Sequence, residues 1–162
     1  MPVSRDDFRK ILGNFASGVT IVTTRVGGST HGMTANAFSS LSLDPPLVLV
    51  CVDKTANSHE LIAEAGFYAV NILSRGQQDI SDEFARKAEG RTHSIDHLAH
   101  RFGVTGAPLL EGCLAYLDCR VTGTYEGGDH TIYVGQVEDG AITLESDPLI
   151  FFRARYVNLG EH

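Results

Sequence analysis

The stretch from residue 32 to residue 52, GMTANAFSSLSLDPPLVLVCV, decides the fold. Residues 38–43 alternate apolar and hydroxyl side chains, which is typical of a strand with one buried face. Residues 47–52 are continuously apolar, which predicts a strand buried on both faces. Asp44-Pro45-Pro46 separates the two runs, because proline cannot donate the hydrogen bond that a strand interior requires.

The same strand signal recurs on both sides of this stretch. Residues 19–24 are β-branched, and a Gly-Gly-Ser turn at 27–29 predicts that residues 30–35 return antiparallel. Further strands are expected at residues 67–73, 114–125, 131–138 and 141–144, the last two joined as a hairpin by Asp139-Gly140. Many short strands joined by turns favour a mainly β, antiparallel barrel or sandwich over alternating βα units.

Two or three helices are expected to flank the strands. The first follows a capping box at Ser4 and Asp7, and its apolar face comprises Phe8, Ile11, Leu12 and Phe15. The second covers residues 57–66, and the third covers residues 74–87 with Ile80 and Phe84 on one face. Residues 88–108 are rich in His, Gly and Arg and are interpreted as a long loop or lid with room for one short helix.

Length and composition bound the function. The chain has 162 residues, 43% of them hydrophobic and 20% charged, which fits a single globular domain over residues 1–162. The net charge of −7 argues against a nucleic-acid or anionic-membrane surface, since such partners require dense Lys and Arg. A small anionic ligand held by a few local cations remains compatible with this charge.

Cysteine usage and the N-terminal sequence predict a cytoplasmic location. Three cysteines are too few for a disulfide scaffold. Cys113 and Cys119 are expected on one face of one strand, about 20 Å apart, which is too far for a bridge. The N-terminal residues are polar and resemble no signal peptide, and no apolar run reaches the roughly 18 residues of a membrane span.

Three segments are candidate ligand sites, and each has a structural alternative. Small and hydroxyl residues at 32–42 would let a flat ligand approach the backbone, or would simply form a polar barrel strand. Residues 53–59 place Lys54 before a helix N-terminus, which could hold a phosphate or be an ordinary helix start. His130 lies in a Gly-rich turn, where it could meet a ligand or be a plain surface histidine.

A histidine cluster in the expected lid could in principle bind a metal. His93, His97 and His100 would share one face of a helix, but no clear carboxylate or cysteine ligand accompanies them. We therefore favour a solvated lid and expect no metal. The sequence also contains no phosphate-binding P-loop and no GxGxxG dinucleotide fingerprint.

Five segments together resemble the flavin reductase-like family, the small NAD(P)H:flavin oxidoreductases of two-component flavin monooxygenases. They are ASGVTIVTT from residue 16, the stretch at 32–52, KTANS from residue 54, Gly-Asp-His at 128–130, and Phe152-Arg153 with Tyr156. The resemblance implies a Greek-key, FMN-binding split β-barrel with flanking helices, which is a homodimer in most members.

The resemblance also implies a site. The flavin ring would lie against residues 34–37, and Phe84 and Ala85 would cover it. The ribityl-phosphate would be held at residues 54–58 and on the strand that follows the ring site. The implied cofactor-binding residues are Thr34, Ala35, Asn36, Ala37, Ser39, Ser40, Lys54, Asn57, Ser58, Phe84, Ala85, His130, Arg153 and Tyr156, with His130 also the implied catalytic residue on the nicotinamide side.

The implied function is hydride transfer from NADH or NADPH to FMN or FAD, with the reduced flavin supplied to a separate monooxygenase. The cofactors carry this chemistry, and the protein contributes binding and orientation. One alternative is a flavin-binding module without turnover. Another is a split-barrel flavoprotein that reduces a different acceptor, such as ferric iron. NADH is favoured over NADPH because no arginine-rich patch awaits a 2′-phosphate.

Overall fold

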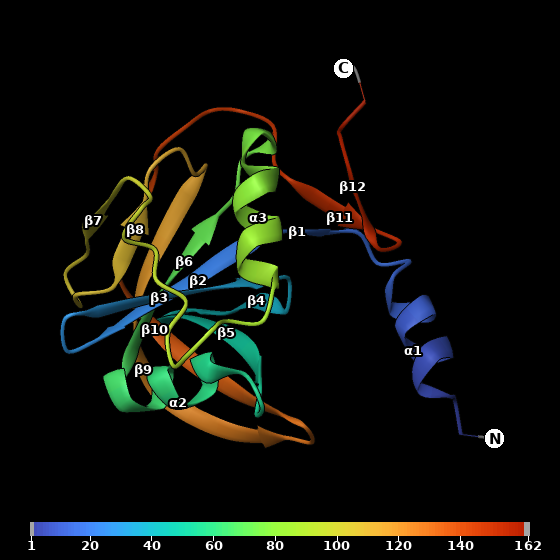
Figure 1. Cartoon of the computed structure of the whole chain (residues 1–162), viewed down its shortest axis with the longest axis horizontal. Helices are drawn as coiled ribbons and strands as arrows, with labels where there is room; N and C mark the ends of the chain where they lie inside the picture. Colours follow the sequence, from blue (N-terminus) through green and yellow to red (C-terminus); the bar gives the residue numbers. More distant parts are fainter. Residues whose placement is uncertain (1, 161–162) are drawn as a thin grey trace.

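Seven antiparallel strands form the main sheet of the structure, a computed structural model that describes residues 2–160 (Figure 1). The strand order is β3-β2-β6-β9-β10-β5-β4, so strands distant in sequence become neighbours, as in Greek-key connections. The strands are β2 (Thr20–Val26), β3 (Ser29–Ala35), β4 (Phe38–Leu43), β5 (Pro46–Asp53), β6 (Phe67–Ile72), β9 (Ala115–Gly127) and β10 (His130–Ile142).

The sheet curls into a barrel that is split between its two end strands. Ala35 of β3 and Phe38 of β4 come from opposite ends of the strand order, yet both pack against one apolar cluster. Tyr68 and Tyr133, from β6 and β10, are fully buried in the middle of that cluster. The predicted mainly β, antiparallel split barrel is therefore confirmed. The fifth strand differs from its prediction, because only Val48, Val50 and Val52 are buried and the residues between them are half-exposed.

Three helices are present among the described residues, as predicted. In α1 (Arg5–Leu12), the Ser4 hydroxyl accepts the Asp7 N–H at 3.1 Å. Helix α2 (Asn57–Ala65) ends at Gly66 in a left-handed conformation, which glycine adopts without strain. Helix α3 (Gln78–Ala85) follows a 3₁₀ turn, η1 (Arg75–Gln77), and ends two residues before the predicted boundary. None of the helices described is long and apolar enough to cross a membrane.

Three predictions about the second half of the chain are wrong. Asp139-Gly140 makes no hairpin turn, because β10 runs on to Ile142 and a register shift beside Asp139 forms a bulge against β9. The expected lid contains a short hairpin, β7 (His100–Phe102) with β8 (Pro108–Leu110), and no helix in the structure described. Cys113 lies before β9 rather than within the same strand as Cys119.

A small three-stranded sheet joins the chain ends beside the barrel. It pairs β1 (Ser17–Gly18) with β11 (Ile150–Phe152), and β11 with β12 (Arg155–Val157). Arg153 and Ala154 turn between the last two strands with left-handed φ angles of 50° and 61°. Figure 1 shows α1 projecting away from the barrel beyond this turn.

Candidate functional site

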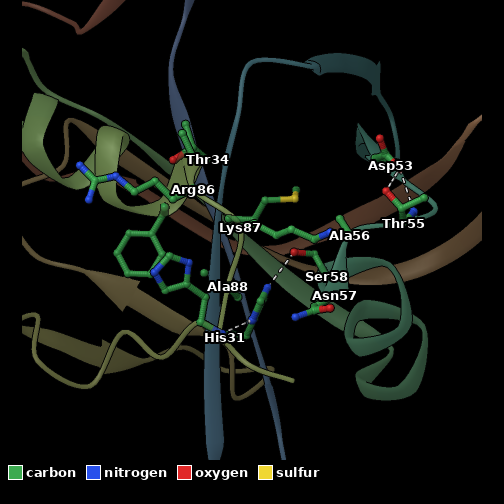
Figure 2. Close-up of a pocket in the computed structure, with 15 residues that line it drawn as sticks. His31, Thr34, Asp53, Thr55, Ala56, Asn57, Ser58, Arg86, Lys87 and Ala88 are labelled. Atoms are coloured by element: carbon green, nitrogen blue, oxygen red, sulfur yellow. Dashed lines mark hydrogen bonds between the residues drawn. The ribbon is translucent and has the colours of Figure 1, made fainter. Parts of the chain in front are cut away.

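A cavity of about 380 Å³ lies where β3, the start of α2 and the segment after α3 meet (Figure 2). Its polar groups come from three elements that are far apart in the sequence. The cavity also has two cationic side chains, Arg86 and Lys87, at the segment that follows α3. Five of the predicted cofactor-binding residues line it: Thr34, Asn57, Ser58, Phe84 and Ala85.

Glycine at position 32 lets the third helix and the following loop approach β3 closely. A Cβ atom built there would lie 2.7 Å from Ile95 Cγ2 and 3.1 Å from the Phe84 ring. Such distances leave no space for any side chain, so the ring of Phe84 packs directly on the backbone of the strand. At Gly32 the close approach is made by the protein's own side chains, and the predicted approach of a flat ligand to residues 32–42 stays a prediction.

Buried polar groups form the floor of the cavity. His31, only 4% exposed, has its Nε2 atom 2.7 Å from Ser58 Oγ, and the His93 N–H donates to its Nδ1 at 2.8 Å. Burial, with a smaller contribution from nearby His93, lowers the pKa of His31 to about 4. The imidazole is therefore neutral near pH 7. Sequence analysis missed this residue, since a histidine on a strand gives no local sign of its partners.

A second, smaller cavity of about 160 Å³ shares Thr34 and Ala85 with the first. Asn36 and Tyr156, two of the predicted cofactor-binding residues, line it. The Tyr156 hydroxyl lies 2.6 Å from Ser81 Oγ and donates to Asp82 at 3.0 Å, so the C-terminal strand is fastened to α3. The two cavities are thus neighbouring spaces on either side of Thr34.

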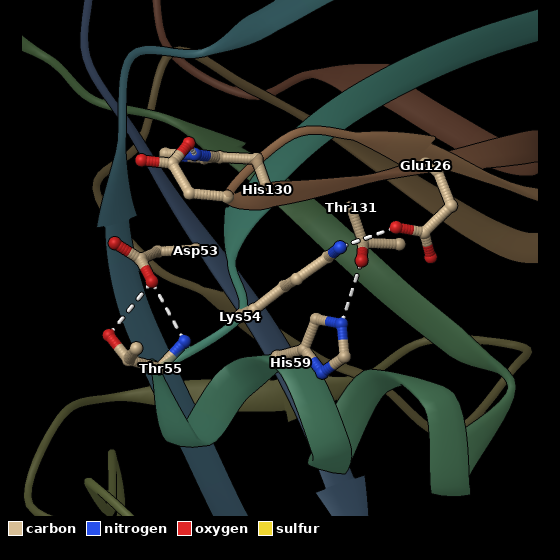
Figure 3. A network of polar contacts seen from close by, with 8 residues as sticks. Asp53, Lys54, Thr55, His59, Glu126, His130 and Thr131 are labelled. Carbon is tan, nitrogen blue, oxygen red and sulfur yellow. Dashed lines mark hydrogen bonds and ion pairs between the residues drawn. The ribbon is translucent and has the colours of Figure 1, made fainter.

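Lys54 and His130 lie in a separate polar network at the end of the barrel (Figure 3). Lys54 forms an ion pair with Glu126 and does not line either cavity. His130 Nδ1 lies 2.7 Å from Asp129, and His130 faces Asp53 across the β5–β10 ladder. Asp53 does line the larger cavity, so this ladder links His130 to its rim.

The Asp53 carboxylate is hydrogen-bonded within the turn that precedes α2. It accepts hydrogen bonds from the Thr55 N–H at 2.7 Å and the Thr55 hydroxyl at 2.8 Å. These bonds hold the pKa of Asp53 below its usual value. An ionised carboxylate at this place repels an anion, so an anionic group would seat on the α2 side of the cavity rather than against Asp53.

Five other predicted residues lie outside these two cavities. Ala35 is buried in the barrel core, and Ala37 is exposed between β3 and β4. Ser39 and Ser40 are exposed on the end strand β4. Arg153 donates through Nε to Asn14 at 2.9 Å, at the foot of α1. Within this single chain they do not join the residues around Thr34.

The lid histidines pack on an aromatic ring instead of converging on a point. His93 and His97 lie with ring centroids 4.4 Å and 6.2 Å from Phe84, and His97 is 2.8 Å from Glu83. His100 points elsewhere, toward the Leu98 carbonyl. Within residues 2–160, no three His, Cys, Asp or Glu side chains gather as metal ligands do.

Comparison with known proteins identifies relatives of this arrangement. A family model described as "Flavin reductase like domain" matches residues 12–160. A Rhodococcus protein named NADH-dependent flavin reductase is 45% identical over 154 residues, covering 93% of this chain and 84% of that protein. The reductase component of 4-hydroxyphenylacetate 3-monooxygenase from Thermus thermophilus is 40% identical over 96% of this chain and 97% of its own.

A solved structure extends the likeness to three dimensions. The NADH:FAD oxidoreductase SgcE6 of Streptomyces globisporus superposes with a TM-score of 0.93 at 36% identity. The match covers 98% of this chain and 95% of that one. The resemblance stated from the sequence motifs is confirmed by these findings.

We predict that His31 makes the folded state less stable as the pH falls from 6.5 toward 4. In this interval the unfolded chain binds a proton that the folded chain excludes, so acidification favours unfolding. The lowered pKa corresponds to about 3 kcal/mol of unfolding free energy at full effect. Urea denaturation of wild type and His31→Asn across this pH range measures it.

The His31→Asn variant should lose less stability on acidification than wild type does. His100→Asn, which makes the same replacement outside the cavity, should keep the wild-type pH dependence. Equal pH dependence in wild type and His31→Asn would show that His31 accepts a proton freely in the folded state.

Proposed function

The chain belongs to the flavin reductase-like family, and from this premise we propose that it oxidises NADH, reduces FMN or FAD, and supplies the reduced flavin to a separate monooxygenase. The observation that carries the proposal is the cavity in which Thr34, Ser58 and Phe84 meet. Two relatives of the chain support the same reaction, since one is named NADH-dependent flavin reductase and the other is a monooxygenase reductase component.

The lining of the two cavities fits a flavin. Gly32 lets Phe84 pack directly on β3, and the Phe84 ring provides an apolar surface in the lining of the larger cavity. The first turn of α2 presents backbone N–H groups that have no partner within a helix, a natural seat for a phosphate. Arg86 and Lys87 add positive charge at the rim. The ring would lie near Thr34, Asn36 and Tyr156, with its phosphate toward Ser58.

The protein's part in the reaction is orientation. When bound, the flavin accepts at N5 the hydride that the nicotinamide releases from C4, so no side chain has to remove a proton. Thr34 donates its hydroxyl hydrogen to the Ser81 carbonyl at 2.7 Å, which leaves its oxygen as an acceptor toward a ligand. His130, at the rim beside Asp53, would hold the carboxamide end of the nicotinamide.

A second copy of the chain is the proposed partner of α1. Phe8, Ile11, Leu12 and Phe15 are between 53% and 82% exposed, and no residue of this helix is buried. A helix of eight residues with its apolar face in water has little stability alone. Burial against a partner molecule would supply that stability and would enclose the adjacent Arg153 turn.

The cytoplasm is the proposed location. Cys51, Cys113 and Cys119 are all free thiols, which a reducing compartment preserves. Burial raises the pKa of Cys113 to about 11 and that of Cys119 to about 12, so these two thiols remain protonated packing groups.

We predict that the purified protein oxidises NADH only when FMN or FAD is present. Loss of NADH absorbance should be followed with each flavin and with NADH or NADPH in turn, in the absence of a monooxygenase. Flavin binding without NADH or NADPH oxidation would indicate a binding module. Oxidation that depends on ferric iron rather than on free flavin would indicate a different acceptor.

We predict that His130→Ala lowers kcat/KM for NADH about 5- to 150-fold and leaves flavin affinity close to wild type. The loss corresponds to one oriented hydrogen bond of about 1–3 kcal/mol. Steady-state kinetics and flavin fluorescence titration measure the two quantities. His100→Ala is the control. Wild-type kinetics in His130→Ala, or weaker flavin binding with normal turnover, would remove His130 from the nicotinamide side.

We predict a dimer in sedimentation equilibrium at micromolar concentration. Leu12→Glu should shift the protein toward monomer, because it places a charge in the apolar face of α1. Val104→Glu, at an exposed position of the β7–β8 turn, is the matched control and should remain dimeric. A monomeric wild type would contradict the proposed partner.

A further inference from the structure

The imidazole of His31 is held in one tautomer by the chain itself. The backbone N–H of His93 donates to Nδ1 at 2.8 Å, so Nδ1 carries a lone pair and not a hydrogen. A neutral imidazole has one protonated and one unprotonated nitrogen. The hydrogen must therefore be on Nε2, the atom that lies 2.7 Å from Ser58 Oγ.

This tautomer determines what the Ser58 hydroxyl can do. Because Nε2 donates, Ser58 Oγ accepts, and its own hydrogen is left to point elsewhere. His31 is the sole side-chain hydrogen-bond partner of Ser58 Oγ within the described chain. Ser58 is 3% exposed and lines the cavity in the first turn of α2, where Figure 2 shows it facing His31. Its hydroxyl hydrogen is thus available to a group inside the cavity.

We infer that His31 is a positioning residue that makes Ser58 a donor to an anionic ligand group, the phosphate of the flavin. The inference rests on the proposed function, which already directs the phosphate toward Ser58, and adds the residue that orients the Ser58 hydroxyl. A hydroxyl that only donates suits an oxygen without a hydrogen, and a phosphate oxygen meets this condition. The free N–H groups of α2 and the Lys87 side chain favour the same charge.

Holding the loop after α3 does not by itself require an imidazole at position 31. That loop is already attached to β3 by Gly32 N–H to the His93 carbonyl at 2.9 Å, and by Ile95 N–H to Thr30 Oγ1 at 3.1 Å. Asn57 also donates to the Gly90 carbonyl at 2.7 Å. What His31 adds to these bonds is a group that accepts from the loop on one side and donates to Ser58 on the other.

The experiment compares FMN with riboflavin, which has the same ring and ribityl chain but no phosphate. Fluorescence titrations give the Kd of each flavin for wild type, His31→Asn, His31→Gln, Ser58→Ala and the double variant His31→Asn/Ser58→Ala. An asparagine amide reaches the position of Nδ1 and a glutamine amide that of Nε2, so only the glutamine keeps a donor toward Ser58. His100→Asn is the matched control.

We expect His31→Asn and Ser58→Ala each to raise the Kd of FMN about tenfold or more while changing that of riboflavin far less. His31→Gln should recover most of the loss. The double variant should be no worse than Ser58→Ala, because the two residues act as one unit. Long-range ¹H–¹⁵N spectra of the wild type should show the hydrogen of His31 on Nε2.

An equal loss for FMN and riboflavin would overturn the inference, as would additive effects in the double variant or a hydrogen on Nδ1. NADH oxidation is measured on the same samples. If the variants show the expected changes in FMN affinity but the wild type oxidises no NADH, the proposed function alone is overturned. If the wild type reduces flavin but the variants lack these changes in FMN affinity, the role of His31 alone is overturned.

Discussion

The close approach of α3 to β3 at Gly32 is the constraint on which the site depends. Phe84 and Ile95 occupy the space where any other residue would carry its Cβ atom. This contact sets the separation between the helix and the strand, and therefore the width of the cavity beside it. It also brings the loop after α3 alongside the unpaired edge of β3, where the Gly32 N–H finds the His93 carbonyl. Because Gly32 has no side chain, Phe84 can pack on β3 and the loop after α3 can cover the edge of this strand.

Negative and positive charges lie on different sides of the cavity, and the negative charge is at the end of β5. The carboxylate of Asp53, the last residue of β5, accepts from Thr55, while Asn57 and Ser58 at the start of the following helix line the cavity. The nearest lysine in sequence, Lys54, is engaged by Glu126 on β9. Positive charge comes instead from Arg86 and Lys87 on the far side. An acidic protein of net charge −7 can therefore offer an anion a locally favourable place.

Local sequence signals predicted the barrel well and the site in part. The strands on either side of Gly27 and Pro45 were predicted from β-branched and apolar runs, from alternation and from turn residues, so they could be located without tertiary information. Asp139-Gly140 could not, since an Asp-Gly pair is compatible with either a hairpin turn or a bulge, and only pairing with β9 decides which. The β7–β8 hairpin was missed because three-residue strands give too little pattern to detect.

Long-range contacts explain why individual site residues were harder to predict than the segments that contain them. Lys54 was expected at a phosphate because it precedes a helix, yet its partner lies 72 residues away on another strand. His31 gave no signal because its tautomer is set by a backbone group 62 residues later.

The proposed function requires a site that orients a flavin strongly but binds it with modest affinity, because the reduced flavin must leave. In the proposed function the Phe84 ring would orient the planar flavin ring through contact area, whereas Ser58 and the N-terminus of α2 would hold its charged end. The smaller cavity is lined by Phe151 and Tyr156 of the small sheet whose turn, at Arg153, is bonded to Asn14 at the foot of α1. If the proposed second copy covers α1, it lies on the side of the small sheet that lines this cavity, so assembly and release of reduced flavin would be coupled.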